Sequence, residues 1–406
     1  MSIIRDITKK AYKYLNDDLI MIFVGARQSG KTNILRQLED YLKKVKKAKN
    51  IFFLNLDDIQ YLDLLNKTPK NIFNILPINL KSKNILFIDE VQYLNNPTNF
   101  LKYIHDEYGD RIKLIVSGSS AFYIDKKFKD SLAGRKKIFE VNVLSFREFL
   151  RFRDEDGLSK GNFREMSLKE REKVSSYYKE YMIWGGYPRV VLSDEEGRKE
   201  ALHDLAYSYI KKDIFESGVR QEDVFYKMFL VLASQIGGLV NISELANTLS
   251  VSKTVIDNYL YIMQKSFHIF LLKPFSRNMR KEITKMPKIY FMDLGLRNFF
   301  LNNFEMFDLR NDKGQLLENA VFKQFANNGL MEKTRFWRTV GKNEIDFVVE
   351  EKNAYEVKVN TDRFKEKDYR VFKKKYPDII LSLSTVDKEK DRVKGHEIYD
   401  VWEIEK

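Results

Sequence analysis

An eight-residue segment near the N-terminus has the residue types and spacing of a phosphate-binding loop. It reads Gly25-Ala26-Arg27-Gln28-Ser29-Gly30-Lys31-Thr32 and fits the pattern G-x-x-x-x-G-K-[ST] at every position. Glycines let backbone N–H groups curl around a phosphate, and a following helix adds the positive end of its dipole. Lys31 would reach the β- and γ-phosphates of ATP, and the Thr32 hydroxyl would hold Mg²⁺. We therefore expect Gly25, Arg27, Gln28, Ser29, Gly30, Lys31 and Thr32 to surround Mg²⁺-ATP, with Lys31 also a catalytic group.

Two adjacent acids follow the apolar run Ile85-Leu86-Phe87-Ile88. Such a run is typical of a strand buried on both faces. At its carboxyl end Asp89 would lie beside the phosphate loop and hold Mg²⁺, and Glu90 would act as the general base toward the attacking water. The alternative is an ordinary strand end whose acids face solvent.

Three further residues are candidates for contact with the γ-phosphate. The run Leu114-Ile115-Val116 ends in hydroxyl residues, of which Ser117 or Ser119 would touch the γ-phosphate or its water. The alternative is a plain strand-to-helix turn. Arg135 follows Gly134 and is a candidate arginine finger, a group that stabilises transition-state charge.

A second group of acids lies near the C-terminus. Asp346 and the Glu356-x-Lys358 pair fall on two short apolar runs, which would bring them to one end of a sheet because residues i and i+2 of a strand share a face. Carboxylates suit Mg²⁺, and Glu318 on the preceding helix would add a third acid. The order helix-Glu, strand-Asp, strand-Glu-x-Lys resembles the PD-(D/E)xK restriction-endonuclease-like fold. On a surface strand, however, Glu-x-Lys is also an ordinary charge pair, and such a fold does not require catalysis.

The candidate site residues must be positioned by strands and helices, and the sequence predicts where these lie. Apolar runs predict strands at 19–24, 50–55, 84–89, 113–117 and 137–141, alternating with helical stretches, which is typical of a parallel α/β sheet. A charged, helix-favouring stretch covers about 151–179, and Gly185-Gly186-Tyr187-Pro188 should break a helix. The pattern is helical from about 200 to 270. One helix follows at 315–328, and then come short strands.

The middle of the chain has the pattern of a helix-turn-helix. Helices are expected at 241–249 and from Ser252 or Lys253 onward, and the apolar runs 267–272 and 288–291 could form a wing around a basic segment. The candidates for contact with nucleic acid are Lys253, Arg277, Arg280 and Lys281. The alternative is that the same unit only packs beside the ATP-binding domain.

We expect three domains: a P-loop ATPase domain at 1–150, a helical region at 151–310 with a winged helix at about 220–300, and an α/β restriction-endonuclease-like domain at 311–406. The 406 residues carry 71 Lys and Arg against 58 Asp and Glu, a net charge of +13. This excess favours a nucleic-acid partner, DNA first, or simply reflects a lysine-rich chain with solvated faces. The absence of cysteine excludes disulfides and thiolate sites and is consistent with the cytoplasm. We expect no membrane partner, because no apolar stretch approaches the length of a span.

Several segments together resemble the predicted AAA+ ATPases of archaea and bacteria that have a C-terminal region of unknown function. They are GARQSGKT, LFIDEVQ, VSGSS, SLAGR, LSFREFL, WGGYP, the Ile210–Ile214 segment and the Gln315–Asn319 helix, and they cover nearly the whole chain. The resemblance implies ATP binding and a sensor or finger role for Arg135. If Arg135 acts in trans, the active form is a homo-oligomer with ATP between subunits.

The sequence thus predicts an ATP-binding and ATP-hydrolysing AAA+ protein that acts on nucleic acid, with a possible Mg²⁺-dependent nuclease-like C-terminal domain. The alternative is a nucleotide-dependent switch or scaffold whose C-terminal domain is a catalytically inactive protein-interaction module. A small-molecule kinase fits less well, because Asp89-Glu90 is typical of a hydrolase and more than half of the chain lies outside the ATP-binding part.

Overall fold

The computed structural model describes residues 3–45, 50–118, 132–209, 211, 214–215, 217–277, 286–341 and 343–404. The candidate residues Ser119, Arg280 and Lys281 lie outside these ranges. The chain divides into two compact units, Met1–Val143 with Lys265–Phe267, and Leu144–Gln264 with His268–Lys406. We call them the first and the second unit.

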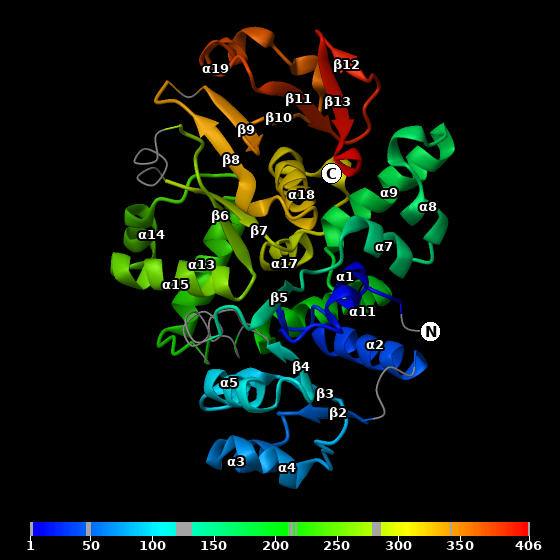
Figure 1. Ribbon diagram of the computed structural model, residues 1–406. Helices are drawn as coiled ribbons and strands as arrows, with labels where there is room; N and C mark the ends of the chain where they lie inside the picture. The colour runs from blue at the N-terminus through cyan, green and yellow to red at the C-terminus, as the bar shows by residue number, and fades with distance from the viewer. Residues whose placement is uncertain are drawn as a thin grey trace. The chain divides into compact units, whose positions relative to one another are not determined.

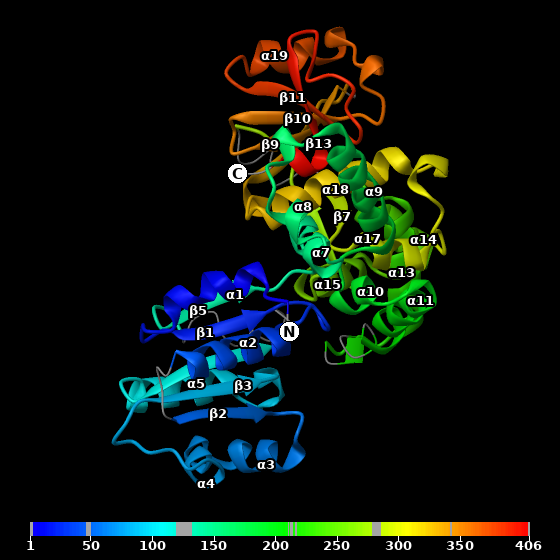
Figure 2. The same ribbon diagram turned by 90° about the vertical axis from the view of Figure 1, so that its right-hand side faces the viewer.

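The first unit is built on a five-stranded sheet in the order β2-β3-β4-β1-β5, in which all neighbouring strands are parallel. Figure 2 shows these strands side by side, with β2 at the lower edge. Their bounds are β1 Ile20–Val24, β2 Asn50–Asn55, β3 Asn84–Asp89, β4 Ile112–Gly118 and β5 Lys136–Glu140. The expected parallel α/β sheet is confirmed, because β1, β3 and β4 are buried along their whole length as continuous apolar runs predict.

Helices cover both faces of this sheet (Figure 1). Leu38 of one helix packs with Phe87 in one apolar cluster, and Ile104 of another packs with Leu86 in a second cluster on the opposite face. Alternate residues of β3 thus serve both clusters, as the two-residue repeat of a strand requires. The helices are α1 Asp6–Ala11, α2 Lys31–Lys44, α3 Ile59–Lys67, α4 Ile72–Ile75 and α5 Pro97–Tyr108.

The second unit begins with a helical region. Its helices are α7 Phe146–Phe152, α8 Asp156–Lys160, α9 Leu168–Trp184, α10 Pro188–Leu192, α11 Glu195–His203, α13 Glu222–Ser234, α14 Ile242–Leu249, α15 Lys253–Lys265 and α17 Leu294–Phe300. The helix α9 starts at a capping box formed by Ser167 and Glu170. It ends at Gly185, whose φ of 78° is a conformation that favours glycine, so the predicted helix break is confirmed.

A two-stranded antiparallel sheet follows the expected pair of helices α14 and α15. It joins β6 (Ile269–Leu272) to β7 (Lys288–Phe291), with Leu272 opposite Lys288. The two expected helices and the two expected strands are therefore present at these places in the chain, and their arrangement as a winged helix stays a prediction.

The C-terminal part contains a mixed six-stranded sheet in the order β12-β13-β11-β10-β9-β8. Its elements are α18 Lys313–Asn327, β8 Thr334–Arg338, β9 Glu344–Val349, β10 Asn353–Val357, α19 Arg370–Lys375, β11 Ile380–Thr385, β12 Arg392–Val393 and β13 His396–Asp400. Phe325 of α18 packs on Phe347, and Phe372 of α19 packs on Trp337, from opposite sides of the sheet (Figure 1). The predicted C-terminal α/β part is thus confirmed as a sheet between two helices.

Candidate nucleotide site and the C-terminal acid cluster

The phosphate loop connects the end of β1 to the start of α2. Gly30 has a φ of 98° at the N-cap of α2, and Gln28 has a φ of 57°, so the loop turns through two left-handed positions. A Cβ added at Gly25 would overlap the backbone of Val141, which explains glycine there. The Lys31 ammonium is folded into the loop and donates to the carbonyl oxygens of Gly25 (3.0 Å) and Ala26 (2.9 Å). The loop thus has the glycine turns, the lysine and the following helix N-terminus that a phosphate-binding loop requires.

The predicted magnesium ligands meet at the carboxyl edge of the sheet. The Thr32 hydroxyl donates to Asp89 Oδ2 at 2.6 Å, and the Ser117 hydroxyl donates to Asp89 Oδ1. This contact follows from strand order, because β4 lies between β3, which ends in Asp89, and β1, which leads into the loop. The structure therefore brings Thr32, Asp89 and Ser117 together.

Glu90 is oriented by a residue that sequence reasoning missed. It has a φ of 57°, its backbone N–H donates to the Ser117 hydroxyl at 3.2 Å, and its carboxylate accepts from Gln92 Nε2. Gln92 is buried and two residues further along the chain. Gln92 belongs to the same segment as Asp89 and Glu90, but a single glutamine in a sequence does not show which side chain it will contact.

A second missed residue, Arg5, supports the phosphate loop from the N-terminal segment. Its guanidinium donates to the carbonyl oxygens of Ser29 (2.8 Å) and Asn142 (2.9 Å), and the side chain is buried. Gln37 of α2 fixes the same segment by accepting from the Thr8 hydroxyl at 2.8 Å and donating to the Ile3 carbonyl at 2.8 Å. The local sequence around Arg5 gives no signal of this role, because the contact spans 24 residues.

Arg135 is not brought to the phosphate loop of its own chain. It directly precedes β5, and its carbonyl accepts from Ile20 N at the start of β1, whereas the loop follows the end of β1. A strand of five residues separates these two edges of the sheet by about 16 Å. The guanidinium instead pairs with Asp106 at 2.7 Å, and this hydrogen bond lowers the pKa of Asp106. Strand direction thus places Arg135 at the edge of the sheet opposite the phosphate loop of its own chain, and its predicted sensor or finger role stays a prediction.

In the second unit, the predicted C-terminal acids Asp346 and Glu356 lie next to each other on neighbouring strands. The register of β9 and β10 pairs Tyr355 with Phe347, so Asp346 and Glu356 are the next pair along the two strands. Asp346 Oδ2 accepts from Val357 N at 2.8 Å, and Glu356 pairs with Lys358 at 2.5 Å. The Glu356 Oε2 atom is buried without a hydrogen-bond partner.

The centre of this cluster is taken by a lysine that sequence reasoning counted only as part of an apolar run. Lys288 Nζ lies 2.9 Å from Glu318 Oε1, 2.5 Å from Glu344 Oε1 and 3.8 Å from Asp346 Oδ1. The Lys288 side chain is 2% exposed. Tyr290, two residues along β7, also donates to Glu318, at 2.6 Å. We call Glu318, Glu344, Asp346 and Glu356 the acid cluster.

Burial and mutual repulsion shift the pKa values of the acid cluster. Burial, with a smaller contribution from the Asp346 charge, raises the pKa of Glu356 to about 8 and that of Glu318 to about 7. Burial lowers the pKa of Lys288, but the charges of the surrounding acids outweigh it and raise that pKa overall, so the ammonium stays charged. Within the part of the chain that the structure describes, no group of three or more His, Asp and Glu side chains is arranged to hold a metal ion. The predicted metal role of Asp346 and Glu356, with Glu318 and Lys358, stays a prediction.

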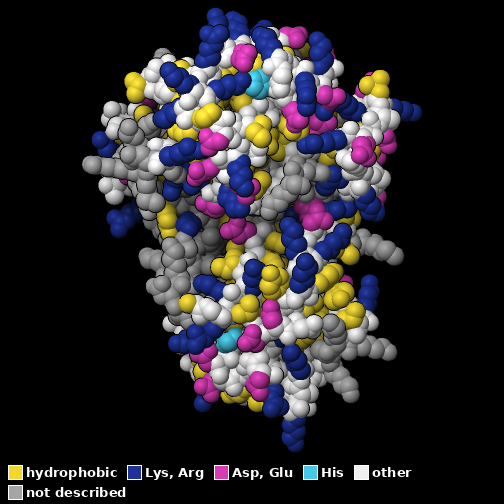
Figure 3. Space-filling view, turned by 45° about the horizontal axis from the view of Figure 1, so that its top comes forward, with side chains coloured by type: hydrophobic (Ala, Val, Ile, Leu, Met, Phe, Trp, Pro, Cys, Tyr) yellow, Lys and Arg dark blue, Asp and Glu magenta, His cyan; other side chains and the backbone are white. Residues whose placement is uncertain are grey.

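The candidate nucleic-acid residues differ in their surroundings. Lys253 is exposed at the start of α15, where the other exposed charges of α14 and α15 include Glu244 and Asp257. Arg277 pairs with Asp378 at 2.7 Å and lies 5.4 Å above the Tyr376 ring. On the face that Figure 3 shows, Lys and Arg side chains are interspersed with Asp and Glu and do not form one patch.

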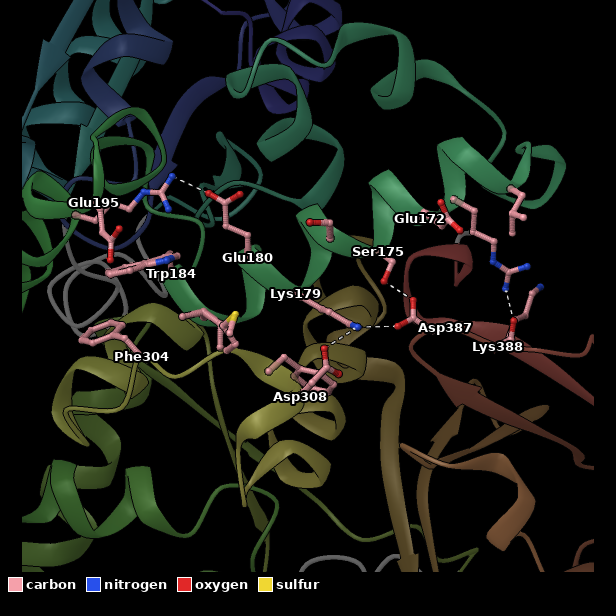
Figure 4. A pocket seen from close by; sticks show the side chains of 17 residues that line it. Glu172, Ser175, Lys179, Glu180, Trp184, Glu195, Phe304, Asp308, Asp387 and Lys388 are labelled. Carbon is pink, nitrogen blue, oxygen red and sulfur yellow. Dashed lines mark hydrogen bonds and ion pairs between the residues drawn. The ribbon is translucent and has the colours of Figure 1, made fainter.

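A cavity of about 800 Å³ lies along α9 in the second unit (Figure 4). Lys179 points between Asp308 (3.1 Å) and Asp387 (2.8 Å), and Arg198 pairs with Glu180 at 2.7 Å. Trp184 and Phe304 form an apolar wall, with ring centroids 4.6 Å apart. Lys179 and Arg198 are thus each paired with acids of the cavity itself.

Comparison with protein families gives three successive matches. Residues 17–150 match a family described as an AAA domain. This match covers most of the first unit. Residues 175–306 and 313–405 each match a domain of unknown function. No helix among the described residues is both long and apolar enough to cross a membrane.

Two uncharacterized relatives are similar to this chain over most of its length. The chain is 28% identical to an uncharacterized protein of Methanocaldococcus jannaschii over 93% of this chain and 84% of the relative. It is 26% identical to an uncharacterized protein of Haemophilus influenzae over 86% of each. Among solved structures, the ADP form of the Aeropyrum pernix ORC2 protein has a TM-score of 0.37 and 14% identity, covering 67% of this chain and 87% of that chain.

Proposed function

We propose that the AAA domain binds Mg²⁺-ATP and hydrolyses it. The observation that supports this most strongly is the chain of contacts Thr32–Asp89–Ser117, with Asp89 held at the edge of the sheet beside the phosphate loop. Thr32 and Asp89 would hold Mg²⁺, which neutralises phosphate charge when bound. Lys31 would leave its carbonyl partners for the β- and γ-phosphates. Glu90, oriented by Gln92, would take the proton of the attacking water.

The test is equilibrium binding of ATP together with release of inorganic phosphate. We expect Lys31→Ala to lose both, and the control Lys44→Ala, on the exposed face of the same helix, to retain both. Wild-type protein that neither binds ATP nor releases phosphate would contradict the proposal.

We further propose that nucleic acid, DNA in the first place, is the partner of the ATPase. The net charge of +13 supports this proposal, as does the presence of two helices and a strand pair in the order of a winged helix. The nearly balanced charge on α14 and α15 gives these two helices no excess of positive charge for phosphate contacts, so the proposal rests on the charge of the whole chain and on the order of the elements. We expect duplex, branched or single-stranded DNA to raise ATP turnover, and affinity to fall steeply with salt. Binding that is undetectable or independent of salt would overturn this step.

A second candidate function is a nucleotide-dependent switch with a non-cutting C-terminal module. The position of Glu318 on a helix and of Asp346 and Glu356 on adjacent strands, with Lys358 directly after the second strand, supports a restriction-endonuclease-like ancestry. The Lys288 ammonium within the acid cluster favours the non-cutting alternative. Incubation of plasmid DNA with Mg²⁺ or Mn²⁺ separates the two. Nicking that disappears in a folded Asp346→Asn variant would establish a nuclease, and intact plasmid is expected from the switch.

A further inference from the structure

We propose that Lys288 is the permanent cation of the acid cluster and takes the place that a divalent metal would need. The proposal concerns the second unit alone and does not depend on ATP hydrolysis. It assigns a role to a residue of β7, which lies outside the helix and strands that supply the acids.

The geometry places one ammonium among three carboxylates. Lys288 Nζ is within 4 Å of oxygen atoms of Glu318, Glu344 and Asp346, which come from α18 and β9. An ammonium has three N–H donors, so it can serve three acceptors at once. Tyr290 adds a fourth donor on the same side, since residues two apart in a strand share a face.

A metal ion would have to use the same oxygen atoms. Mg²⁺ requires ligands at about 2.0–2.1 Å in near-octahedral geometry. The Glu318 and Glu344 oxygens nearest to Lys288 are already bonded to its ammonium, and two cations placed among the same three acids would repel each other. The acids therefore do not fit a metal while Lys288 is in place.

Burial makes this arrangement hard to open. The Lys288 side chain is 2% exposed, and β7 is held by pairing with β6, in which Leu272 lies opposite Lys288. Removing one partner of a buried ion pair leaves the other charges uncompensated. Without Lys288, the carboxylates would need another cation, and a divalent ion would then stabilise the fold.

The proposal also distinguishes Lys288 from Lys358. Lys358 belongs to the Glu-x-Lys pair that the sequence pattern singles out, and it contacts Glu356 at the rim with its side chain 32% exposed. Lys288 lies at the centre with its side chain almost fully buried. We expect Lys288 to be the lysine that decides whether the cluster accepts a metal.

The test measures Mn²⁺ binding by calorimetry and thermal unfolding, in nucleotide-free full-length protein. Wild-type protein should bind no Mn²⁺ at the cluster and show an unfolding temperature that Mn²⁺ does not change. Lys288→Ala should unfold at a lower temperature, which Mn²⁺ should raise by several degrees, and it should bind about one Mn²⁺ per chain. Adding Asp346→Asn to Lys288→Ala should abolish that binding.

Two control variants and one alternative to Lys288→Ala complete the test. Lys288→Arg retains the charge and should bind no Mn²⁺. Lys179→Ala removes a different lysine that pairs with two acids in the same unit, and should also gain no site. If Lys288→Ala does not fold, Lys288→Met with Glu344→Gln lowers the uncompensated charge and should show the same rescue. Stoichiometric Mn²⁺ binding by wild-type protein that Asp346→Asn abolishes would overturn the proposal, as would a folded Lys288 variant that Mn²⁺ leaves unchanged.

Discussion

Arg5 links the N-terminal segment to the phosphate loop through buried hydrogen bonds to Ser29 and Asn142. Arg5→Met removes the guanidinium that donates to both carbonyl oxygens. The loss of a hydrogen bond from a charged group lowers the free energy of unfolding by about 1.5–3 kcal/mol. We expect a lower free energy of unfolding and weaker ATP binding, measured by denaturant titration and nucleotide titration. Lys9→Met, on exposed surface of the same segment, should change neither. Wild-type affinity in a destabilised Arg5→Met would limit Arg5 to a purely structural role.

Asp400 gives the second unit a pH-dependent stability. Burial raises its pKa from 3.8 to about 6, although Arg171 and Lys388 N bond to it. Between these pKa values the folded protein keeps a proton that the unfolded chain releases. The stabilising contribution of protonated Asp400 is therefore present below about pH 3.8 and is lost as pH rises toward and beyond 6.

Asp400→Asn should remove this dependence, which amounts to at most about 3 kcal/mol for a shift of this size. Denaturant unfolding across acid to neutral pH measures it, as the difference between wild type and variant. An unchanged slope in the variant would show that Asp400 titrates normally.

The residues that sequence reasoning identified are those whose partners lie nearby in sequence or whose strand ends must meet. Lys31 and Thr32 belong to one contiguous motif, and Asp89 follows a buried strand, so their positions were predictable. Lys288 was not, because its contact with Glu318 joins segments 30 residues apart and depends on how β7 approaches α18. Arg5 was missed for the same reason, since its contact with Ser29 spans 24 residues. Gln92 was missed although its partner Glu90 lies only two residues away, because a single polar residue has no pattern.

At the scale of elements, the junction of α9 and α17 depends on glycines. Gly295 of α17 lies so close to the end of α9 that an added Cβ would overlap the Trp184 backbone. The Asp293 carboxylate accepts hydrogen bonds from Gly186 N (2.7 Å) and Leu296 N (2.9 Å). The sequence identified the Gly185-Gly186 pair only as a helix break, but the pair also leaves room for the Asp293 carboxylate and hydrogen-bonds to it through Gly186 N.

Gly295→Ala should lower the free energy of unfolding by about 1–3 kcal/mol, as overpacking does. Gly314→Ala is the matched control, because a Cβ there meets nothing within 4 Å and α18 contains the residue. Alanine in a helix is favoured over glycine by up to about 1 kcal/mol, so the control should be neutral or stabilising. Equal effects of both substitutions on thermal unfolding would argue against the close approach.

Elements were easier to predict than contacts. The five parallel strands were predicted within one or two residues because each contains adjacent apolar residues. Of these strands, β1, β3 and β4 are buried along their whole length, whereas β2 and β5 are partly exposed. Helix α18 was likewise expected at 315–328 and is found at Lys313–Asn327. The place of β7 against the acid cluster could not be predicted, because strand β7 alone shows only a four-residue apolar pattern.

For the molecule as a whole, Arg135 raises the question of assembly. Because Arg135 lies at the edge of the sheet opposite its own phosphate loop, any finger role requires the ATP of a second copy. We expect Arg135→Ala to bind ATP normally and to lose hydrolysis, and wild-type turnover per subunit to rise with protein concentration. Arg111→Ala, another exposed arginine of the first unit that pairs with an aspartate, should keep full turnover. Turnover that is independent of concentration in monomeric protein would exclude supply in trans.

The central claim, that this chain hydrolyses ATP at the edge where Thr32, Asp89 and Glu90 meet, is tested most directly by Glu90→Gln. ATP binding and phosphate release are measured in the same samples. We predict wild-type affinity for ATP and a fall in phosphate release of about 10²-fold or more, because the amide cannot accept the proton of the attacking water. A Glu90→Gln variant that binds ATP and releases phosphate at the wild-type rate would contradict this account.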